Sequence, residues 1–160
     1  MTEYEGSTRG DGRRILLVVS RFNELVTEKL LEGARSCLLQ QGVPEEGLDV
    51  VRVPGAFEIP GVVGVALRRG GYDGVVALGC VIRGETPHID YVAGEAARGL
   101  QSLAVTHDTP IGFGILTTDD RAQALARAGG DRGNKGWEAA LTTLEMIDLY
   151  GRLGAGAGEE

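Results

Sequence analysis

Four short segments rich in apolar residues recur along the chain, and each has the length and composition of a buried β-strand. The first, at residues 15–19, has no polar position, which is typical of a strand whose two faces are both covered by helices. The others follow at residues 48–53, 74–78 and 111–116. The chain therefore predicts a sheet of four strands.

Between these segments the apolar residues change to helical spacing. Val26, Leu30, Ala34 and Cys37 recur every three or four positions, and Gly42 ends the pattern. Further helices are predicted at about 59–69, 89–107, 119–128 and 135–152, with a loop at 129–133. Right-handed crossovers convert this order into an α/β fold. We expect a three-layer αβα sandwich of the flavodoxin-like type, with a central parallel four-stranded sheet.

The length of the chain indicates a single domain. With 160 residues it can bury most of its apolar surface, and we expect residues 1–153 to form one unit that begins with an N-terminal segment, 1–13. The tail, 154–160, has nothing to bury and is expected to be disordered. Many of the 26 glycines fall where strands and helices are predicted to end, which indicates tight turns and close approach to ligands.

Charge and cysteine spacing argue against several classes of function. A net charge of −7 without a long basic run disfavours nucleic acid as a partner. No apolar segment is long enough to span a membrane, and the polar N-terminus does not resemble a signal peptide, so a cytoplasmic location is expected. Cys37 and Cys80 lack the spacing of metal ligands. We expect buried reduced thiols and no metal site.

The segment with the clearest chemistry is 79–88, with the sequence GCVIRGETPH. It follows the third predicted strand and precedes the helix predicted to begin near Ile89. Open α/β sheets bind ligands at such strand ends, and the free N–H groups of a helix start suit an anion. Thr86 can cap this helix. His88 would then lie beside a bound phosphate as a candidate proton carrier.

The ends of the other strands offer aromatic and backbone polar groups. The first ends in SRFN, residues 20–23, and lacks the G-x-G-x-x-G loop of dinucleotide-binding proteins. No acidic cluster follows the first or third strand, which disfavours a response-regulator receiver. Residues 55–58, GAFE, and Phe113 complete the set. Aromatic faces suit a flat heterocycle, so we expect one pocket that holds a planar ring beside a small phosphate ester.

Each candidate residue also has a plainer interpretation. Phe22 could be a core or helix-staple aromatic, and Glu58 a first-turn carboxylate favoured by the helix dipole. His88 could be an exposed residue at a helix start. Arg127 and Lys135 are individually ordinary solvated cations. The functional interpretation depends on the presence of all of these residues together.

Six segments form a specific combination: 20–23, 53–60, 79–91, 110–118, 127–129 and 133–140. In this order they resemble the lumazine synthase family, and the similarity extends from about residue 4 to residue 153. Two departures are small. Ile89 stands where an aromatic residue is common, and residues 130–132 replace a more usual Thr-Lys pattern.

The resemblance implies a transferase that catalyses the penultimate step of riboflavin biosynthesis. The family condenses 5-amino-6-(D-ribitylamino)uracil with 3,4-dihydroxy-2-butanone 4-phosphate to 6,7-dimethyl-8-ribityllumazine, phosphate and water, without a cofactor. One alternative is a non-catalytic flavin- or lumazine-binding module of the same fold, and another is a structural shell protein that has lost catalysis. Arg127 and His88 would have no obvious purpose in the binding module, and the presence of His88, Arg127 and Lys135 speaks against the shell protein.

The resemblance also implies roles for individual residues. The ring and ribityl chain are bound by Phe22, which stacks on the pyrimidine, and by Ala56, Phe57, Glu58, Cys80, Val81 and Ile82. The phosphate is contacted by Glu85 and Thr86, with Arg127 as the main positive charge and Lys135 nearby. His88 donates and accepts protons, and Phe113 comes from a neighbouring subunit.

The implied partners are further copies of this chain and the two small-molecule substrates. A site shared between subunits implies a homopentamer, and the absence of an insertion between Arg127 and Asn134 favours an icosahedral shell of pentamers. Riboflavin synthase is a candidate partner inside such a shell. The N-terminal segment, from Tyr4 onward, is expected to pair with the sheet edge of a neighbour. No nucleic acid or membrane partner is expected.

Overall fold

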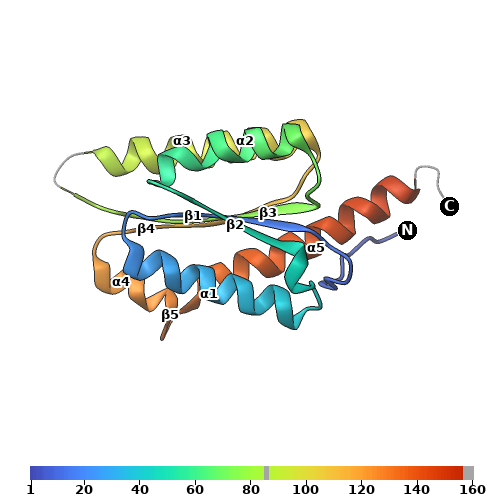
Figure 1. Cartoon of the computed structure of the whole chain (residues 1–160), viewed down its shortest axis with the longest axis horizontal. Helices are drawn as coiled ribbons and strands as arrows, with labels where there is room; N and C mark the ends of the chain where they lie inside the picture. Colours follow the sequence, from blue (N-terminus) through green and yellow to red (C-terminus); the bar gives the residue numbers. More distant parts are fainter. Residues whose placement is uncertain (85–86, 157–160) are drawn as a thin grey trace.

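A parallel sheet of four strands forms the middle layer of the molecule in the computed structural model, which describes residues 1–84 and 87–156 (Figure 1). The strand order is β2-β1-β3-β4, and all neighbouring pairs are parallel. The strands are β1 (Ile15–Ser20), β2 (Leu48–Val53), β3 (Gly74–Ile82) and β4 (Ile111–Thr118). The predicted α/β sandwich is confirmed.

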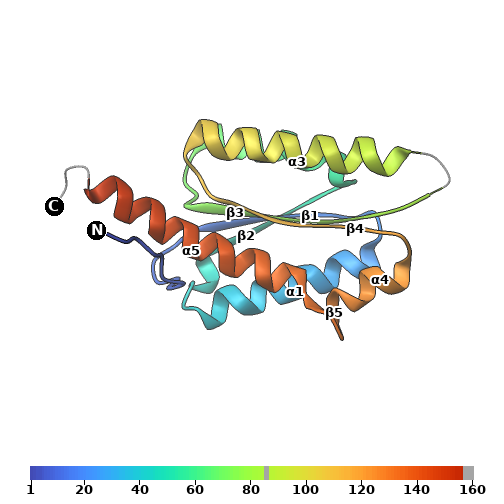
Figure 2. The same cartoon turned by 180° about the vertical axis from the view of Figure 1, so that it is seen from behind.

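Helices cover both faces of this sheet (Figures 1 and 2). They are α1 (Glu24–Gln40), α2 (Ile59–Arg69), α3 (His88–His107), α4 (Arg121–Ala126) and α5 (Lys135–Gly156), with 3₁₀ turns η1 (Glu45–Gly47) and η2 (Ala56–Glu58). Side chains alternate along β1, so that Leu17 and Val19 pack under α1 and α5, whereas Leu16 and Val18 pack under α2 and α3. This alternation produces two separate hydrophobic cores.

Several boundaries differ from those predicted, including the ends of β4, at Thr118, and of α4, at Arg121 and Ala126. β3 continues to Ile82 rather than ending at residue 78, because β4 pairs with it as far as Thr118. The start of segment 79–88 is therefore strand and not loop. The expected loop at 129–133 is a small antiparallel hairpin of β5 (Ala128–Gly130) and β6 (Gly133–Asn134). α5 reaches Gly156, while residues 157–160 of the expected tail lie outside the described residues.

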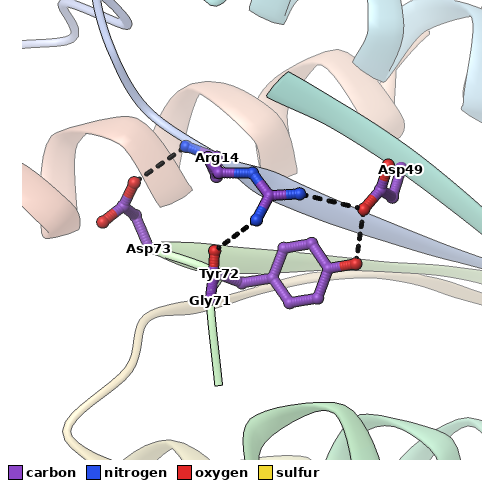
Figure 3. A network of polar contacts seen from close by, with 5 residues as sticks. All are labelled: Arg14, Asp49, Gly71, Tyr72 and Asp73. Atoms are coloured by element: carbon purple, nitrogen blue, oxygen red, sulfur yellow. Dashed lines mark hydrogen bonds and ion pairs between the residues drawn. The ribbon is translucent and has the colours of Figure 1, made fainter. Parts of the chain in front are cut away.

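A polar network joins the beginnings of three strands (Figure 3). The Arg14 guanidinium lies 3.3 Å from an Asp49 carboxylate oxygen and donates to the Gly71 carbonyl oxygen at 3.1 Å. The Tyr72 hydroxyl donates to the same Asp49 oxygen at 2.5 Å, and the Asp73 carboxylate accepts from the Arg14 backbone N–H. These contacts hold edge strand β2 to the two central strands at the end of the sheet away from the carboxyl ends.

Candidate active site

A pocket of about 560 Å³ opens at the carboxyl ends of β1 and β3. These two strands are neighbours, but the chain leaves them in opposite directions, toward β2 from β1 and toward β4 from β3. Such a change of direction creates the crevice in which open α/β sheets bind ligands. The pocket is lined by Phe22, Pro54, Gly55, Ala56, Phe57, Glu58, Cys80, Val81, Ile82, His88, Tyr91 and Val92.

Phe22 projects from a short connection between β1 and α1. The backbone N–H of Arg21 donates to the Val53 carbonyl oxygen at 2.8 Å, and that of Phe22 donates to the Pro54 carbonyl oxygen at 3.0 Å. The backbone is thus fixed while the Phe22 ring is 71% exposed. An exposed aromatic ring on a fixed backbone at a pocket rim is suited to stacking on a flat ligand.

Residues 56–58 form η2, which leads directly into α2. The Glu58 carboxylate accepts a hydrogen bond from the Gly55 N–H at 2.9 Å, so it stabilises this helix start through a capping hydrogen bond. Glu58 also lines the pocket, beside the buried Ala56 and the 58% exposed ring of Phe57. The structural role and a ligand-binding role are therefore compatible.

The end of β3 supplies Cys80, Val81 and Ile82. The Cys80 side chain is only 2% exposed, and burial raises the pKa of its thiol to about 11. The thiol is consequently neutral near pH 7 and packs as an apolar group. Its carbonyl oxygen accepts a hydrogen bond from the Asn23 side chain at 2.9 Å.

His88 is the first residue of α3, is exposed, and lines the pocket. Tyr91 lies one helical turn further along the same face and is 69% exposed. Sequence reasoning did not select Tyr91, although its i, i+3 spacing from His88 was visible. Glu85 and Thr86, the predicted phosphate contacts and helix cap, lie outside the described residues.

Three predicted site residues do not line this pocket. Phe113 lies inside edge strand β4 opposite Ala77, rather than at a strand end as expected, because four further residues of β4 still pair with β3 beyond Leu78. Its ring is 41% exposed. Arg127 directly follows α4 and Lys135 begins α5, and these two helices cover the other face of the sheet from α3 (Figure 1).

Arg127 and Lys135 are neighbours in space. The Lys135 N–H donates to the Arg127 carbonyl oxygen at 2.8 Å, across the ends of the β5–β6 hairpin. The Arg127 guanidinium donates to the Gln123 carbonyl oxygen at 3.1 Å, and the Lys135 ammonium lies 4.0 Å from a Glu138 carboxylate oxygen. The structure therefore groups eight of the predicted side chains in one pocket and two predicted cations at a second place.

Within residues 1–84 and 87–156, no group of three or more His, Cys, Asp or Glu side chains is arranged to hold a metal ion. In the same ranges, none of the helices combines the length and apolar character needed to cross a membrane.

The sequence is closely similar to known proteins over almost its whole length. The family model of 6,7-dimethyl-8-ribityllumazine synthase matches residues 12–151. A 6,7-dimethyl-8-ribityllumazine synthase of Gemmatimonas aurantiaca is 55% identical over 152 residues, which cover 95% of this chain and 93% of the relative. Those of Nautilia profundicola and Chlorobium phaeobacteroides are each 47% identical, over 96% and 92% of this chain and 100% and 96% of their own lengths. The chain belongs to the 6,7-dimethyl-8-ribityllumazine synthase family.

Proposed function

We propose that the pocket at the ends of β1 and β3 is where this enzyme of riboflavin biosynthesis binds 5-amino-6-(D-ribitylamino)uracil and condenses it with 3,4-dihydroxy-2-butanone 4-phosphate. The observation that carries this proposal is the convergence of eight predicted residues, from three separate segments, on one pocket. Its volume of about 560 Å³ lies within the usual range for small-molecule sites, about 300–1,000 Å³.

The pyrimidine ring would stack on Phe22 and meet the backbone at the end of β3. Backbone groups of alternate residues in a parallel strand point to the same neighbouring strand. The Cys80 carbonyl oxygen points toward the side of β1, where it accepts from Asn23, so the backbone groups of Ile82 point the same way. Because β1 ends at Ser20, the N–H and C=O of Ile82 can bind the edge of a heterocycle.

The phosphate would bind near the N-terminus of α3, where free N–H groups and the helix dipole favour an anion. His88, at that terminus, would transfer protons during amine attack on the ketone, phosphate elimination and ring closure. These steps need no strong nucleophile, and much of the acceleration would come from holding two substrates together.

Phe113, Arg127 and Lys135 would reach this pocket from a neighbouring subunit. Three features support this part of the proposal: these residues do not line their own chain's pocket, Phe113 is exposed on an edge strand, and the rings of Phe22 and Phe57 are left uncovered. The active unit would then be a homopentamer, with the N-terminal segment on a neighbour's sheet edge and pentamers assembled into a shell. A cytoplasmic location belongs to the same proposal.

The test is to mix the purified protein with both substrates and follow the fluorescence of the lumazine product. Product formation that requires both substrates is expected, whereas binding of lumazine without turnover would favour the non-catalytic module. Subunit sharing is tested by refolding His88→Ala chains together with Arg127→Ala chains. If the two residues serve one site from different subunits, the mixture is more active than either variant alone at a limiting concentration of the phosphate ester; a mixture no more active than the mean of the two variants would place them in the same subunit.

A further inference from the structure

Asn23 has an unusual backbone conformation beside the pocket. Its φ of 64° and ψ of 46° lie in the left-handed region, which in the described part of the chain only one other non-glycine residue, Asp108, shares through a positive φ. Asparagine is among the few side chains that tolerate this region without a large strain. Asn23 therefore allows the chain to turn sharply from β1 into α1.

The Asn23 side chain does not cap the helix that follows it. It stands at the N-cap of α1, where an asparagine commonly accepts from a helix N–H, but no such side-chain bond is made. Instead its amide nitrogen donates to the Cys80 carbonyl oxygen on β3, 57 residues away in the sequence. The side chain thus connects two pocket walls rather than capping its own helix.

This connection bridges a gap in the sheet. β1 and β3 pair up to Val19 and Leu78. The segment after β1 then bonds on the β2 side, where the Phe22 N–H donates to the Pro54 carbonyl oxygen. Beyond that point β3 has lost its neighbour on this side. The Asn23 amide takes the place of the missing backbone donor opposite Cys80.

We infer that Asn23 is a positioning residue of the proposed site, acting through Phe22. The Phe22 backbone is held on the β2 side by Pro54 and on the β3 side by the Asn23 amide. The Phe22 ring is 71% exposed and has little packing of its own. These backbone hydrogen bonds therefore set the position and orientation of the ring on which the ligand would stack. Pre-organisation of this kind lowers the cost of binding a ligand. The inference rests on the proposed function of the pocket.

The test compares steady-state kinetics of Asn23→Gly with those of wild type. Glycine retains access to the left-handed backbone but removes the amide, so the fold is expected to persist. Loss of one hydrogen bond predicts a KM for the ribitylamino-uracil raised about 3- to 10-fold, with kcat and the KM of the phosphate ester nearly unchanged. Asn23→Asp, which places a carboxylate against the Cys80 carbonyl oxygen, is expected to show a larger effect on the same KM.

Two further variants separate positioning from a general structural role. In a Phe22→Ala background the Asn23→Gly effect on KM is expected to disappear, because the residue through which it acts is gone. Asp108→Gly, at the other left-handed non-glycine position, is expected to leave both KM values unchanged. Equal increases in both KM values, or additivity with Phe22→Ala, would overturn the inference. A wild-type protein without turnover would instead refute the proposed function.

Discussion

Replacing Gly136 by alanine sets helix propensity against packing at the start of α5. Alanine is favoured over glycine in a helix by about 1 kcal/mol. However, a Cβ at Gly136 would lie 2.0 Å from the Leu30 carbonyl oxygen and 2.8 Å from its carbon. The backbones of α1 and α5 would have to separate by about 1.4 Å, the difference between 2.0 Å and the 3.4 Å of an ordinary contact.

Packing should win this competition. Overpacked cores lose roughly 1–3 kcal/mol, and the upper end applies here because the added Cβ meets a backbone carbonyl group, which cannot rotate away as a side chain can. The net expectation for Gly136→Ala is a free energy of unfolding lower by about 2 kcal/mol. Gly151→Ala, in the same helix but with nothing within 4 Å of the added Cβ, is the matched control and should gain about 0.5–1 kcal/mol.

Equilibrium unfolding in urea measures both variants, with the fluorescence of Trp137, the single tryptophan, as the signal. Trp137 packs against the α1–α5 core next to the substituted residue, so it reports on the interface in question. All samples need one protein concentration, because assembly adds to apparent stability. A Gly136→Ala protein as stable as wild type would refute the close approach of α5 to Leu30.

Three further predictions concern single side chains. His88→Ala should slow turnover, measured by product fluorescence across pH, about 100-fold or less, since proximity supplies much of the acceleration. The same substitution should leave the stability of the fold unchanged. Arg127→Ala should raise the KM of the phosphate ester roughly 10- to 100-fold and that of the pyrimidine far less; equal changes would indicate misfolding. Tyr72→Phe should cost about 1 kcal/mol of unfolding free energy near pH 7. The hydrogen bond to Asp49 and burial raise the Tyr72 pKa above its ordinary value of 10, so the wild-type advantage should persist up to about pH 10 and be lost as pH rises through the raised pKa.

The layers of the fold could be predicted because apolar periodicity reports on which face of an element is buried. Leu16 and Leu17 belong to different cores, as a strand covered on both faces requires. The full length of β3 could not be predicted, because residues 79–82 are strand only through their pairing with β4. The β5–β6 hairpin was missed for a related reason. Three of its five strand residues are glycine, and the positive φ angles at Gly129 and Gly133 permit a tight turn that an apolar pattern does not predict.

The pocket could be predicted in part because parallel strands bring their carboxyl ends together. That rule correctly grouped Phe22, residues 56–58 and residues 80–82, but it wrongly placed Phe113, whose strand continues to Thr118. The rule did not predict the place of Arg127 and Lys135, since these residues flank the β5–β6 hairpin and do not follow a strand of the main sheet. The rule also did not select Asn23, because the role of this residue depends on a backbone angle and a long-range hydrogen bond.

Within one chain, Arg127 does not line the pocket that contains His88, so the main positive charge proposed for the phosphate ester is missing from that pocket. The described residues that line the pocket are mostly apolar and suit a neutral ring, and among them the start of α3 is what favours a phosphate dianion. If Arg127 and Lys135 belong to a neighbour, as we propose, the charge needed for the second substrate is present only in the assembled site. Disassembly would then abolish binding of the phosphate ester while leaving the Phe22 wall of the pocket in place. Activity should therefore fall with dissociation of subunits before the individual chains unfold.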